Sequence, residues 1–483
     1  MRRYGVFLLM FWLWLGPGGA LAEVRSPAFQ ERDDWSGTYY RGHKLGFTHA
    51  RVERDGPDLV VHTRVFFRLN AGGAEQSTII TQTTRLDERL RLKRFSLLQE
   101  IMGNRQRVEG RRNGGVLEYE VTTRGYQKTK TMPLDEDIYP ASTVWLNVMD
   151  RGLKVGDSGT LRIFIEPFQM ITPMSYRVLR AEKVKVNGRE HEALVVHQNY
   201  AGMDSTLWVG KDGSILLERT PHGFESRLED EETAQDLGPG TLSVSNLITL
   251  SLITVNRAIP DPEALEELTV RLSRLRRPDA VPEDQRQTVL QSAPTGGGLY
   301  TLTLRVRPEA PLRAAPVGLP VSGLNRPEYL AESPEIQSKH PMIQALAREL
   351  VGEGRQAWPA ARAINRWVFR NLDKVLVDSF TALDALHRRR GECQSHTNLF
   401  AALARAAGIP TRVVNGLVYS RQYKGFLYHA WPEVYVGEWR ALDPTLGQER
   451  VDATHIKLST GNYEGALKLM EFIGQVRIEL PEP

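Results

Sequence analysis

Cysteine is almost absent from this chain: Cys393 is the single cysteine among 483 residues. A lone thiol has no partner for a disulfide within the chain, so cross-links cannot stabilise the fold. Such a thiol becomes a candidate nucleophile when a base can reach it. His429 follows Cys393 by 36 residues and Asp443 follows His429 by 14, so the sequence offers a base and an orienting carboxylate. We therefore interpret Cys393 as a catalytic nucleophile.

An excess of charge of one sign is also lacking. The chain has 62 basic and 58 acidic side chains, a net charge of +4 that falls to +2 if Arg2 and Arg3 are removed with a leader peptide. Nucleic-acid-binding domains usually carry a strongly basic face or stripe. We therefore expect no nucleic-acid partner, and we interpret short basic clusters such as 388–390 as solvated surface.

Long hydrophobic runs are missing as well. The run at 6–15 has about ten apolar residues, whereas a membrane-spanning helix needs roughly 20. Arg2 and Arg3 precede this run and the pattern Ala20-Leu21-Ala22 follows it, which is typical of a signal peptide with its cleavage site. We predict that residues 1–22 direct export to the periplasm and are then removed. An uncleaved membrane anchor is the alternative.

Length and pattern divide the rest of the chain into three parts. Residues 23–250 contain β-rich runs separated by turn signals, which predicts an antiparallel β domain. Residues 251–325 predict a small β module, with a strand at 268–275, and a proline-rich linker. Helical periodicity begins near residue 326, so 326–483 is predicted to mix helices and strands, and the class of the whole chain is predicted as α+β. The turn signals are Asn113-Gly114, Asn187-Gly188 and Asp212-Gly213.

The nucleophile is predicted to open a helix. Residues at helical spacing run from Cys393 to Ala407, and Gly408 and Pro410 end the pattern. The first turn of a helix carries the positive end of the helix dipole and unpaired backbone N–H groups. This location favours a thiolate and supplies donors to the oxyanion of a tetrahedral intermediate. The expected supporting residues are Gln394, His396 and Trp431.

His429 and Asp443 are predicted to lie on neighbouring strands, 428–436 and 439–442. A strict two-residue turn at Gly437-Glu438 places the two side chains on opposite faces of the sheet, because side chains alternate along a strand. The triad therefore requires a three-residue loop or a bulge, for which Pro432 is a candidate position.

Other interpretations of the same residues stay open. His396 shares a helix face with Cys393 and is a rival base, although no carboxylate is obviously placed to orient it. A lone cysteine at a helix start is often a buried small apolar residue. Cys393, His396 and His429 lack the close spacing and the second thiolate of a zinc site, so we expect no metal and no cofactor.

Several segments resemble the transglutaminase-like superfamily, a papain-related fold with a Cys, His, Asp triad. The similar segments occur in the family's order over about residues 335–460: Gly391–His396, Ala404–Val414, Tyr428–Tyr435, Trp439 and Asp443–Thr445. The resemblance implies a C-terminal papain-like domain in which Cys393 is the nucleophile, His429 the base and Asp443 the orienting residue. Gln448 and Asp452–Leu458 are similar to a continuation in bacterial members. Ser395 departs from the pattern, because many bacterial members have an acidic residue there.

Together these features predict an exported cysteine enzyme of the peptidase, amidase or transglutaminase type. It transfers the acyl group of an amide, through an acyl-enzyme on Cys393, to water or to an amine. The expected substrate is a protein, a peptide or a cell-wall peptide, and the β region at 23–250 is expected to hold an envelope protein partner. The alternatives are a non-catalytic envelope scaffold or binding protein and an assembly factor for other envelope proteins.

Overall fold

A computed structural model describes residues 31–482 apart from the segments 72–73, 102, 136, 201, 212, 222, 239–251, 313–314, 376–380, 463–464 and 466–467. The predicted signal peptide at 1–22 lies outside the described residues. Among the residues that are described, none of the helices is both long enough and apolar enough to cross a membrane. The chain separates into two compact units, an N-terminal one within 8–244 and a C-terminal one comprising 245–483 and the short segment 124–126.

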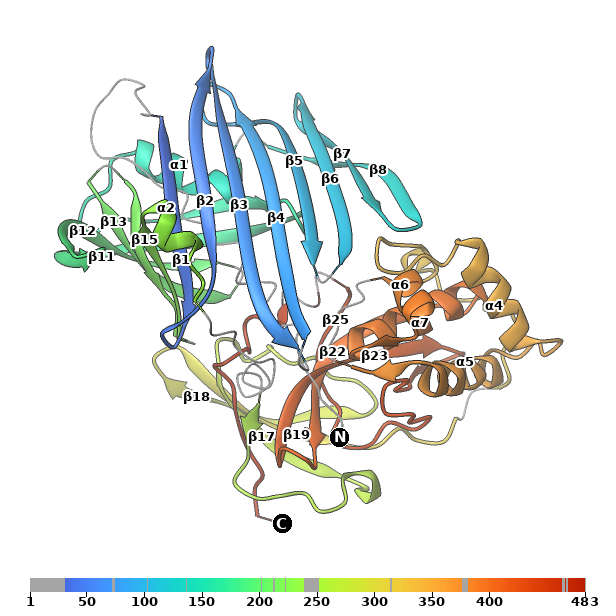
Figure 1. Ribbon diagram of the computed structural model, residues 1–483. Helices are drawn as coiled ribbons and strands as arrows, with labels where there is room; N and C mark the ends of the chain where they lie inside the picture. Colours follow the sequence, from blue (N-terminus) through green and yellow to red (C-terminus); the bar gives the residue numbers. More distant parts are fainter. Residues whose placement is uncertain are drawn as a thin grey trace. The chain divides into compact units, whose positions relative to one another are not determined.

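The N-terminal unit is built on one sheet, for which the described residues give 15 strands in the order β8-β7-β6-β5-β4-β3-β2-β1-β15-β14-β13-β12-β11-β10-β9. Figure 1 shows β2 to β6 of this sheet as long neighbouring strands in blue. The strands are β1 (Arg32–Tyr40), β2 (His43–Asp55), β3 (Asp58–Ala71), β4 (Ala74–Leu86), β5 (Leu92–Ile101), β6 (Asn104–Asn113), β7 (Val116–Thr123), β8 (Tyr126–Pro133), β9 (Ile138–Pro140), β10 (Ser158–Ile165), β11 (Met170–Val186), β12 (Arg189–Tyr200), β13 (Met203–Gly210), β14 (Ile215–Arg219) and β15 (Phe224–Glu229). Its helices are η2 (Ala141–Thr143), α1 (Val144–Asp150) and α2 (Glu231–Gln235).

The sheet is a sequence of hairpins whose turns have a local cause. Gly114 and Gly188 have φ of 60° and 75°, in the left-handed region that glycine adopts without strain, and each lies in the turn between two paired strands. Side chains alternate between buried and exposed along β6, so Val108 faces inward while arginines face solvent. Strands β1 to β7 pair with one another in antiparallel fashion, whereas β9 pairs with β10 in parallel.

The C-terminal unit surrounds one buried helix, α7 (Cys393–Ala406). Every residue from Gln394 to Ala404 is buried, as expected for a helix covered on all sides. Figure 1 shows α4 to α7 as a group of orange helices beside β22 and β23. The other helices are α4 (Pro341–Val351), α5 (Ala357–Asn371), α6 (Ala382–Arg388), η3 (Pro262–Ala264) and η4 (Pro327–Tyr329). The strands are β16 (Ile253–Thr254), β17 (Leu268–Leu275), β18 (Gln287–Gly296), β19 (Leu299–Val306), β20 (Asp373–Lys374), β21 (Arg390–Gly391), β22 (Thr411–Ser420), β23 (Gly425–Tyr435), β24 (Trp439–Ala441), β25 (Ile456–Thr460) and β26 (Arg477–Glu479).

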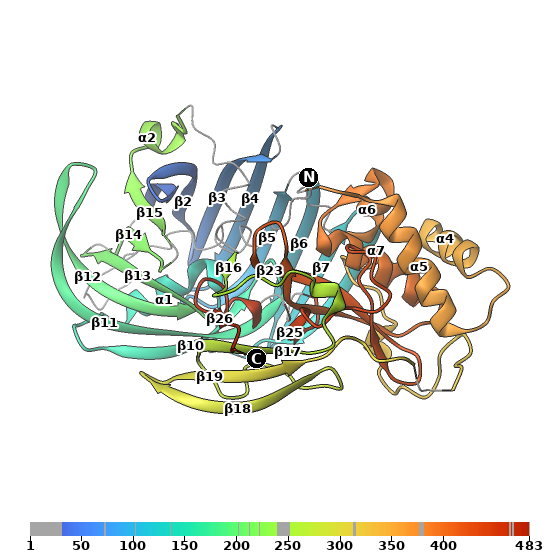
Figure 2. The ribbon, with the colours of Figure 1, turned by 90° about the horizontal axis from the view of Figure 1, so that it is seen from below.

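Strands from residues 253–306 pair with strands that follow residue 410. β16 pairs with β23, and β17 pairs with β26 in the sheet β18-β19-β17-β26; Figure 2 shows β17, β18 and β19 as neighbours. Polar side chains join the same segments: Gln287 donates to Lys457 O at 2.9 Å, and Glu309 lies 3.3 Å from Arg440. Residues 253–306 are therefore packed into the C-terminal unit.

The predicted α+β class is wrong, because the protein is mostly β, with 50% of residues in strands and 17% in helices. The reason is one of proportion. The helical periodicity after residue 326 corresponds to α4, α5, α6 and α7, but strands outnumber helices among the described residues and run for up to 17 residues in the N-terminal unit.

Candidate active site

Cys393 is the first residue of α7, as the sequence predicts. The residue before it, Glu392, caps the helix, since its carboxylate accepts a hydrogen bond of 2.9 Å from the backbone N–H of Gln394. Cys393 is partly exposed, whereas Glu392 and Gln394 on either side are buried. Cys393 therefore keeps partial exposure at the start of a helix whose next 11 residues are buried.

The sulfur is held between a carboxylate and a backbone amide. Cys393 donates its S–H to Glu392 Oε2 at 3.0 Å. Burial raises the pKa of the Cys393 thiol well above its ordinary value, and the charge of Glu392 raises it further, while the N–H of Ala430 acts in the opposite direction. Burial also raises the pKa of Glu392. In this arrangement the resting thiol keeps its proton.

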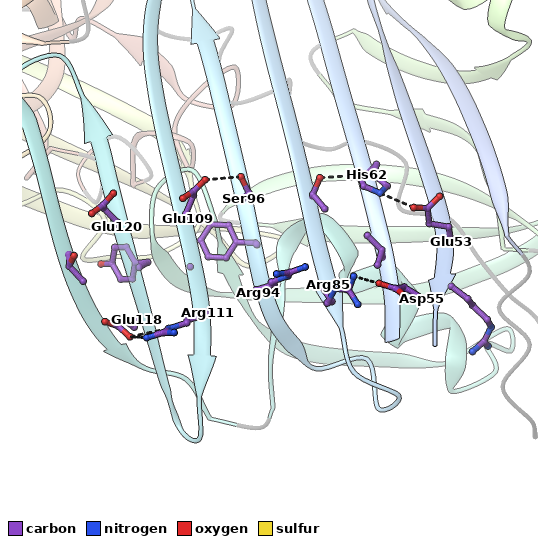
Figure 3. A pocket seen from close by; sticks show the side chains of 17 residues that line it. Glu53, Asp55, His62, Arg85, Arg94, Ser96, Glu109, Arg111, Glu118 and Glu120 are labelled. Atoms are coloured by element: carbon purple, nitrogen blue, oxygen red, sulfur yellow. Dashed lines mark hydrogen bonds and ion pairs between the residues drawn. The ribbon is translucent and has the colours of Figure 1, made fainter. Parts of the chain in front are cut away.

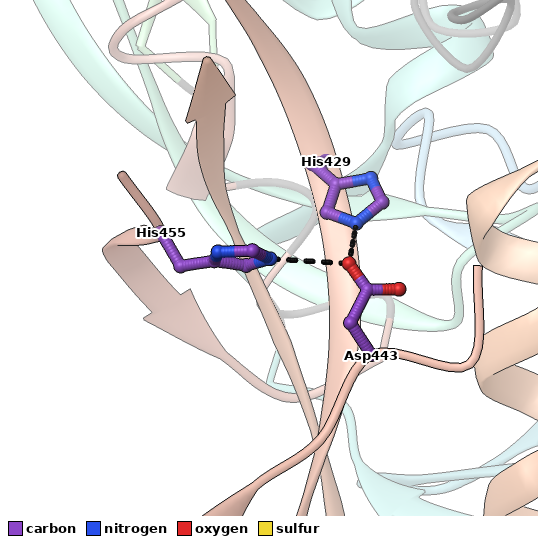
Figure 4. A group of neighbouring side chains, drawn as sticks. All are labelled: His429, Asp443 and His455. Carbon is purple, nitrogen blue, oxygen red and sulfur yellow. Dashed lines mark hydrogen bonds and ion pairs between the residues drawn. The ribbon is translucent and has the colours of Figure 1, made fainter. Parts of the chain in front are cut away.

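His429 lies in β23, directly before Ala430, and its ring is bound to Asp443. The distance from His429 Nε2 to Asp443 Oδ2 is 2.7 Å, and both side chains are buried (Figure 4). Thr397 of α7 donates to Ala430 O at 3.1 Å, which ties the first turns of the nucleophile helix to this part of the strand. The structure thus brings Cys393, His429 and Asp443 to one place.

The loop between β23 and β24 has the length that places His429 and Asp443 on the same face of the sheet. Tyr435 pairs with Trp439, so the connecting loop is the three residues 436–438. With this register Glu433 pairs with Ala441, and Asp443 follows on the side of the sheet that carries His429. Of the two arrangements predicted, a three-residue loop or a bulge, the structure has the loop.

The Asp443 carboxylate has a second histidine partner that the sequence analysis did not identify. His455 Nε2 lies 3.1 Å from Asp443 Oδ2, the same oxygen that His429 contacts (Figure 4). The other ring nitrogen of His455, Nδ1, lies 3.1 Å from Asp452 Oδ1. The spacing of Asp452 and His455 by three residues was the available signal, but the contact with Asp443 depends on the path of the chain into β25.

These charges affect one another. Burial alone lowers the pKa of His455, but the Asp452 and Asp443 carboxylates raise it to about 9. Burial alone raises the pKa of Asp443, yet His429 and His455 hold it well below its usual range. Asp443 stays ionised and His455 stays protonated at neutral pH.

The expected supporting residues occupy different positions. Trp431 is fully buried and covers both rings, at 6.1 Å between centroids from His429 and 5.2 Å, edge to face, from His455. Gln394 donates its side-chain amide to Asn398 at 3.2 Å. His396, the rival base, has Nδ1 at 2.9 Å from Glu392 O, and burial lowers its pKa.

His429, Asp443 and His455 also place three potential metal-ligand atoms within 4.8 Å of one another. A metal ion needs an unprotonated ring nitrogen from each histidine. Both nitrogens of His455 face carboxylate oxygens, which only accept hydrogen bonds, so both carry protons. The group is therefore suited to a hydrogen-bonded charge cluster.

The N-terminal unit has a cavity of about 820 Å³ on one face of its sheet, lined by residues of β2 to β8 (Figure 3). Its charges are largely paired: Arg85 bonds Asp55, His62 Nε2 lies 3.1 Å from Glu53, and Arg111 Nη2 lies 3.1 Å from Glu118. The other ring nitrogen of His62, Nδ1, lies 3.0 Å from the hydroxyl oxygen of Thr83, so His62 links a hydroxyl to a carboxylate in this lining.

Comparison with known proteins finds the transglutaminase-like superfamily at residues 344–444. The uncharacterized protein ML0607 of Mycobacterium leprae (strain TN) is 30% identical over 121 residues, which are 23% of this chain and 42% of that protein. Kyphoscoliosis peptidase of Mus musculus is 26% identical over 133 residues, 24% of this chain and 20% of the peptidase. The chain thus spans less than half the length of these relatives.

Two solved structures are similar at low identity. A candidate cysteine protease from Cytophaga hutchinsonii has a TM-score of 0.31 and 21% identity, over 44% of this chain and 83% of that one. A β-barrel-like protein with a domain of unknown function from Brucella abortus has a TM-score of 0.31 and 10% identity, over 41% and 95%. The family match contains Cys393, His429 and Asp443 but ends before Asp452 and His455. Residues 344–444 of this chain belong to the transglutaminase-like superfamily.

Proposed function

We propose that this chain is a cysteine-dependent enzyme that acts on amides through a thioester on Cys393. The observation that carries the proposal is the 2.7 Å hydrogen bond between His429 Nε2 and Asp443 Oδ2, next to the strand residue whose N–H faces the thiol. This bond leaves Nδ1 of His429 available to exchange a proton with sulfur. The superfamily of residues 344–444 and the similarity to a peptidase support an amide as the substrate class.

In the first half of the reaction, His429 takes the thiol proton and the thiolate attacks the carbonyl carbon of the amide. The carbonyl oxygen gains the negative charge, near the N-terminal end of α7. When the tetrahedral intermediate collapses, the C–N bond breaks and the imidazolium of His429 gives its proton to the departing amine. A thioester on Cys393 remains.

In the second half, water or another amine loses a proton to His429 and attacks the thioester carbon. The C–S bond breaks, and the sulfur leaves as a thiolate that is protonated again by His429. Asp443 accepts a hydrogen bond from the Nε2–H of His429 throughout, and this bond holds the ring in the tautomer that the reaction needs. The choice between hydrolysis and transfer depends on which acceptor enters.

The leader pattern at 1–22 supports a periplasmic location, in which protein, peptide and cell-wall peptide substrates are all available. The N-terminal unit would act in partner binding, since the charges that line its cavity are largely paired. A scaffold with an unused triad is the competing function, and it is favoured by the protonated resting thiol.

Alkylation of Cys393 separates the two. We expect iodoacetamide to modify Cys393 more slowly in His429→Ala than in the wild type at the same pH, because His429 is the base that takes the thiol proton. His387→Ala is the matched control, because it removes an exposed histidine at the end of α6. Equal rates in the wild type and in His429→Ala would refute the nucleophile assignment, and a slow but accessible thiol would support the scaffold.

A further inference from the structure

Asp443 is shared by two histidines, although a triad needs only one. Its Oδ2 accepts from His429 at 2.7 Å and from His455 at 3.1 Å, while its Oδ1 accepts from the backbone N–H groups of Thr445 at 2.7 Å and Leu446 at 2.9 Å. Four donors on one fully buried carboxylate fix its position and its charge. The two backbone donors belong to the turn that follows Asp443, and His429 belongs to the proposed triad. Neither role explains the fourth donor, His455.

His455 lies between two carboxylates in a closed environment. Its Nε2 faces Asp443 and its Nδ1 faces Asp452, each at 3.1 Å, and its side chain is fully buried. Carboxylates can only accept, so both nitrogens donate and the ring is an imidazolium. The titratable groups that face it are Asp443, Asp452 and His429, and Trp431 closes the remaining side.

We propose that His455 is a positioning residue of the active site, an imidazolium at neutral pH that fixes Asp443 and offsets part of its negative charge. This inference rests on the proposed function, since it concerns the partner of the catalytic base. The chain of contacts is then Cys393, His429, Asp443, His455 and Asp452.

The charge of His455 has a chemical consequence for His429. A buried, uncompensated carboxylate holds the proton of a neighbouring imidazolium strongly, which makes that proton harder to deliver to a leaving amine. The positive charge of His455 weakens this hold. Removal of His455 should therefore slow the step in which His429 gives its proton to the leaving amine.

Three full-length variants test this. His455→Gln keeps a donor toward Asp443 but removes the charge. Asp452→Asn leaves the histidine but removes one of its carboxylates. Thr454→Val is the matched control, because it removes a hydroxyl that donates to Asp452 at 2.6 Å and leaves both carboxylates and His455 in place.

We expect kcat of His455→Gln to fall by about tenfold to hundredfold, the range for outer residues that orient a catalytic group. KM should stay unchanged, and the acid limb of the pH profile, below which His429 cannot take the thiol proton, should move to higher pH. Near pH 6, Asp452→Asn should behave like the wild type, because the Asp443 carboxylate alone keeps His455 protonated. Near pH 9, Asp452→Asn should behave like His455→Gln. Thr454→Val should lose stability without moving the limb.

The second readout does not depend on turnover. In protein labelled with 15N-histidine, the His455 signals, identified by their loss in His455→Gln, should show two protonated ring nitrogens at pH 7 to 8. One unprotonated nitrogen at pH 7, or an acid limb that does not move in His455→Gln, would overturn the proposal. An unreactive Cys393 together with a doubly protonated His455 would refute the enzyme assignment and leave the charged chain of contacts standing.

Discussion

Replacement of Gly416 by alanine would test how tightly the active-site strands are packed. Gly416 lies in β22, opposite His429 of β23, and at the bulge where β22 meets β25. A Cβ atom at this position would lie 2.1 Å from the backbone oxygen of Ile456 and 2.7 Å from Cη2 of Trp431. Both neighbours are fully buried, so neither has open space into which it can move.

The size of the effect follows from which atoms must move. Overpacking of a core costs about 1–3 kcal/mol, and the cost here should reach about 3 kcal/mol because a backbone oxygen cannot rotate away. For a unit of this size, each kcal/mol lowers the unfolding temperature by about 2–4 °C, so a fall of about 6–12 °C is expected. Since Ile456 follows His455, the displacement should also weaken the contact with Asp443.

Differential scanning calorimetry and the rate of Cys393 alkylation measure the two consequences. The control is Gly318→Ala in the same unit, where the nearest atom to an added Cβ is 3.7 Å away and ordinary contact results. If Gly416→Ala unfolds within 2 °C of Gly318→Ala, the close packing of β22 against β25 and Trp431 is not as described, and the reasoning fails.

Three further predictions concern charge and domain boundaries. Glu392→Gln keeps the cap on Gln394 but removes the negative charge beside the thiol. Alkylation of Cys393 should become faster by about tenfold or more, since a unit charge at 4 Å is worth about 4 kcal/mol. The rates of the variant and the wild type should become equal at low pH, where the raised pKa of Glu392 leaves its carboxyl group neutral. The rise of the His455 pKa from 6.5 to about 9 on folding corresponds to about 3 kcal/mol of stability, which is present below pH 6.5 and is lost as pH rises to 9. Urea unfolding at pH 6 and pH 9 should show this loss in the wild type, whereas the free energy of unfolding of His455→Gln should depend less on pH. A fragment of residues 252–482 should unfold cooperatively, whereas a fragment of residues 326–482 should not. The shorter fragment lacks β16 and β17, and its Arg440 loses the buried partner Glu309. Equal calorimetric transitions for the two fragments would contradict this prediction.

The elements around the nucleophile could be predicted from the sequence because their signals are local. Helical spacing and the glycine and proline that end it predict 393–407, and the structure has Cys393–Ala406. The prediction of a strand at 268–275 is confirmed as β17. The three-residue loop at 436–438 followed from requiring two side chains on one face of a hairpin. Each of these depends on neighbours within about a dozen residues.

Features that depend on distant contacts could not be predicted in the same way. The class of the chain was wrong, because a helical pattern in one region does not reveal how many strands join one sheet elsewhere. Glu392 was overlooked because its role depends on where its carboxylate turns after capping the helix. His455 was overlooked because its contact with Asp443 is set by the turn at 452–455 and by the pairing of β25 with β22.

The position of Glu392 changes how activation of the thiol is understood. A helix N-terminus by itself favours a thiolate, which was the expectation from sequence. Here an anionic carboxylate already satisfies the N–H of Gln394 and also accepts the thiol proton, so the positive end of α7 is partly neutralised where the sulfur lies. Ionisation of Cys393 must then depend on His429, whose own proton is governed by Asp443 and, through it, by His455. Control of the nucleophile would reside in the strands β23 to β25 and the turns between them, and the helix would supply its location.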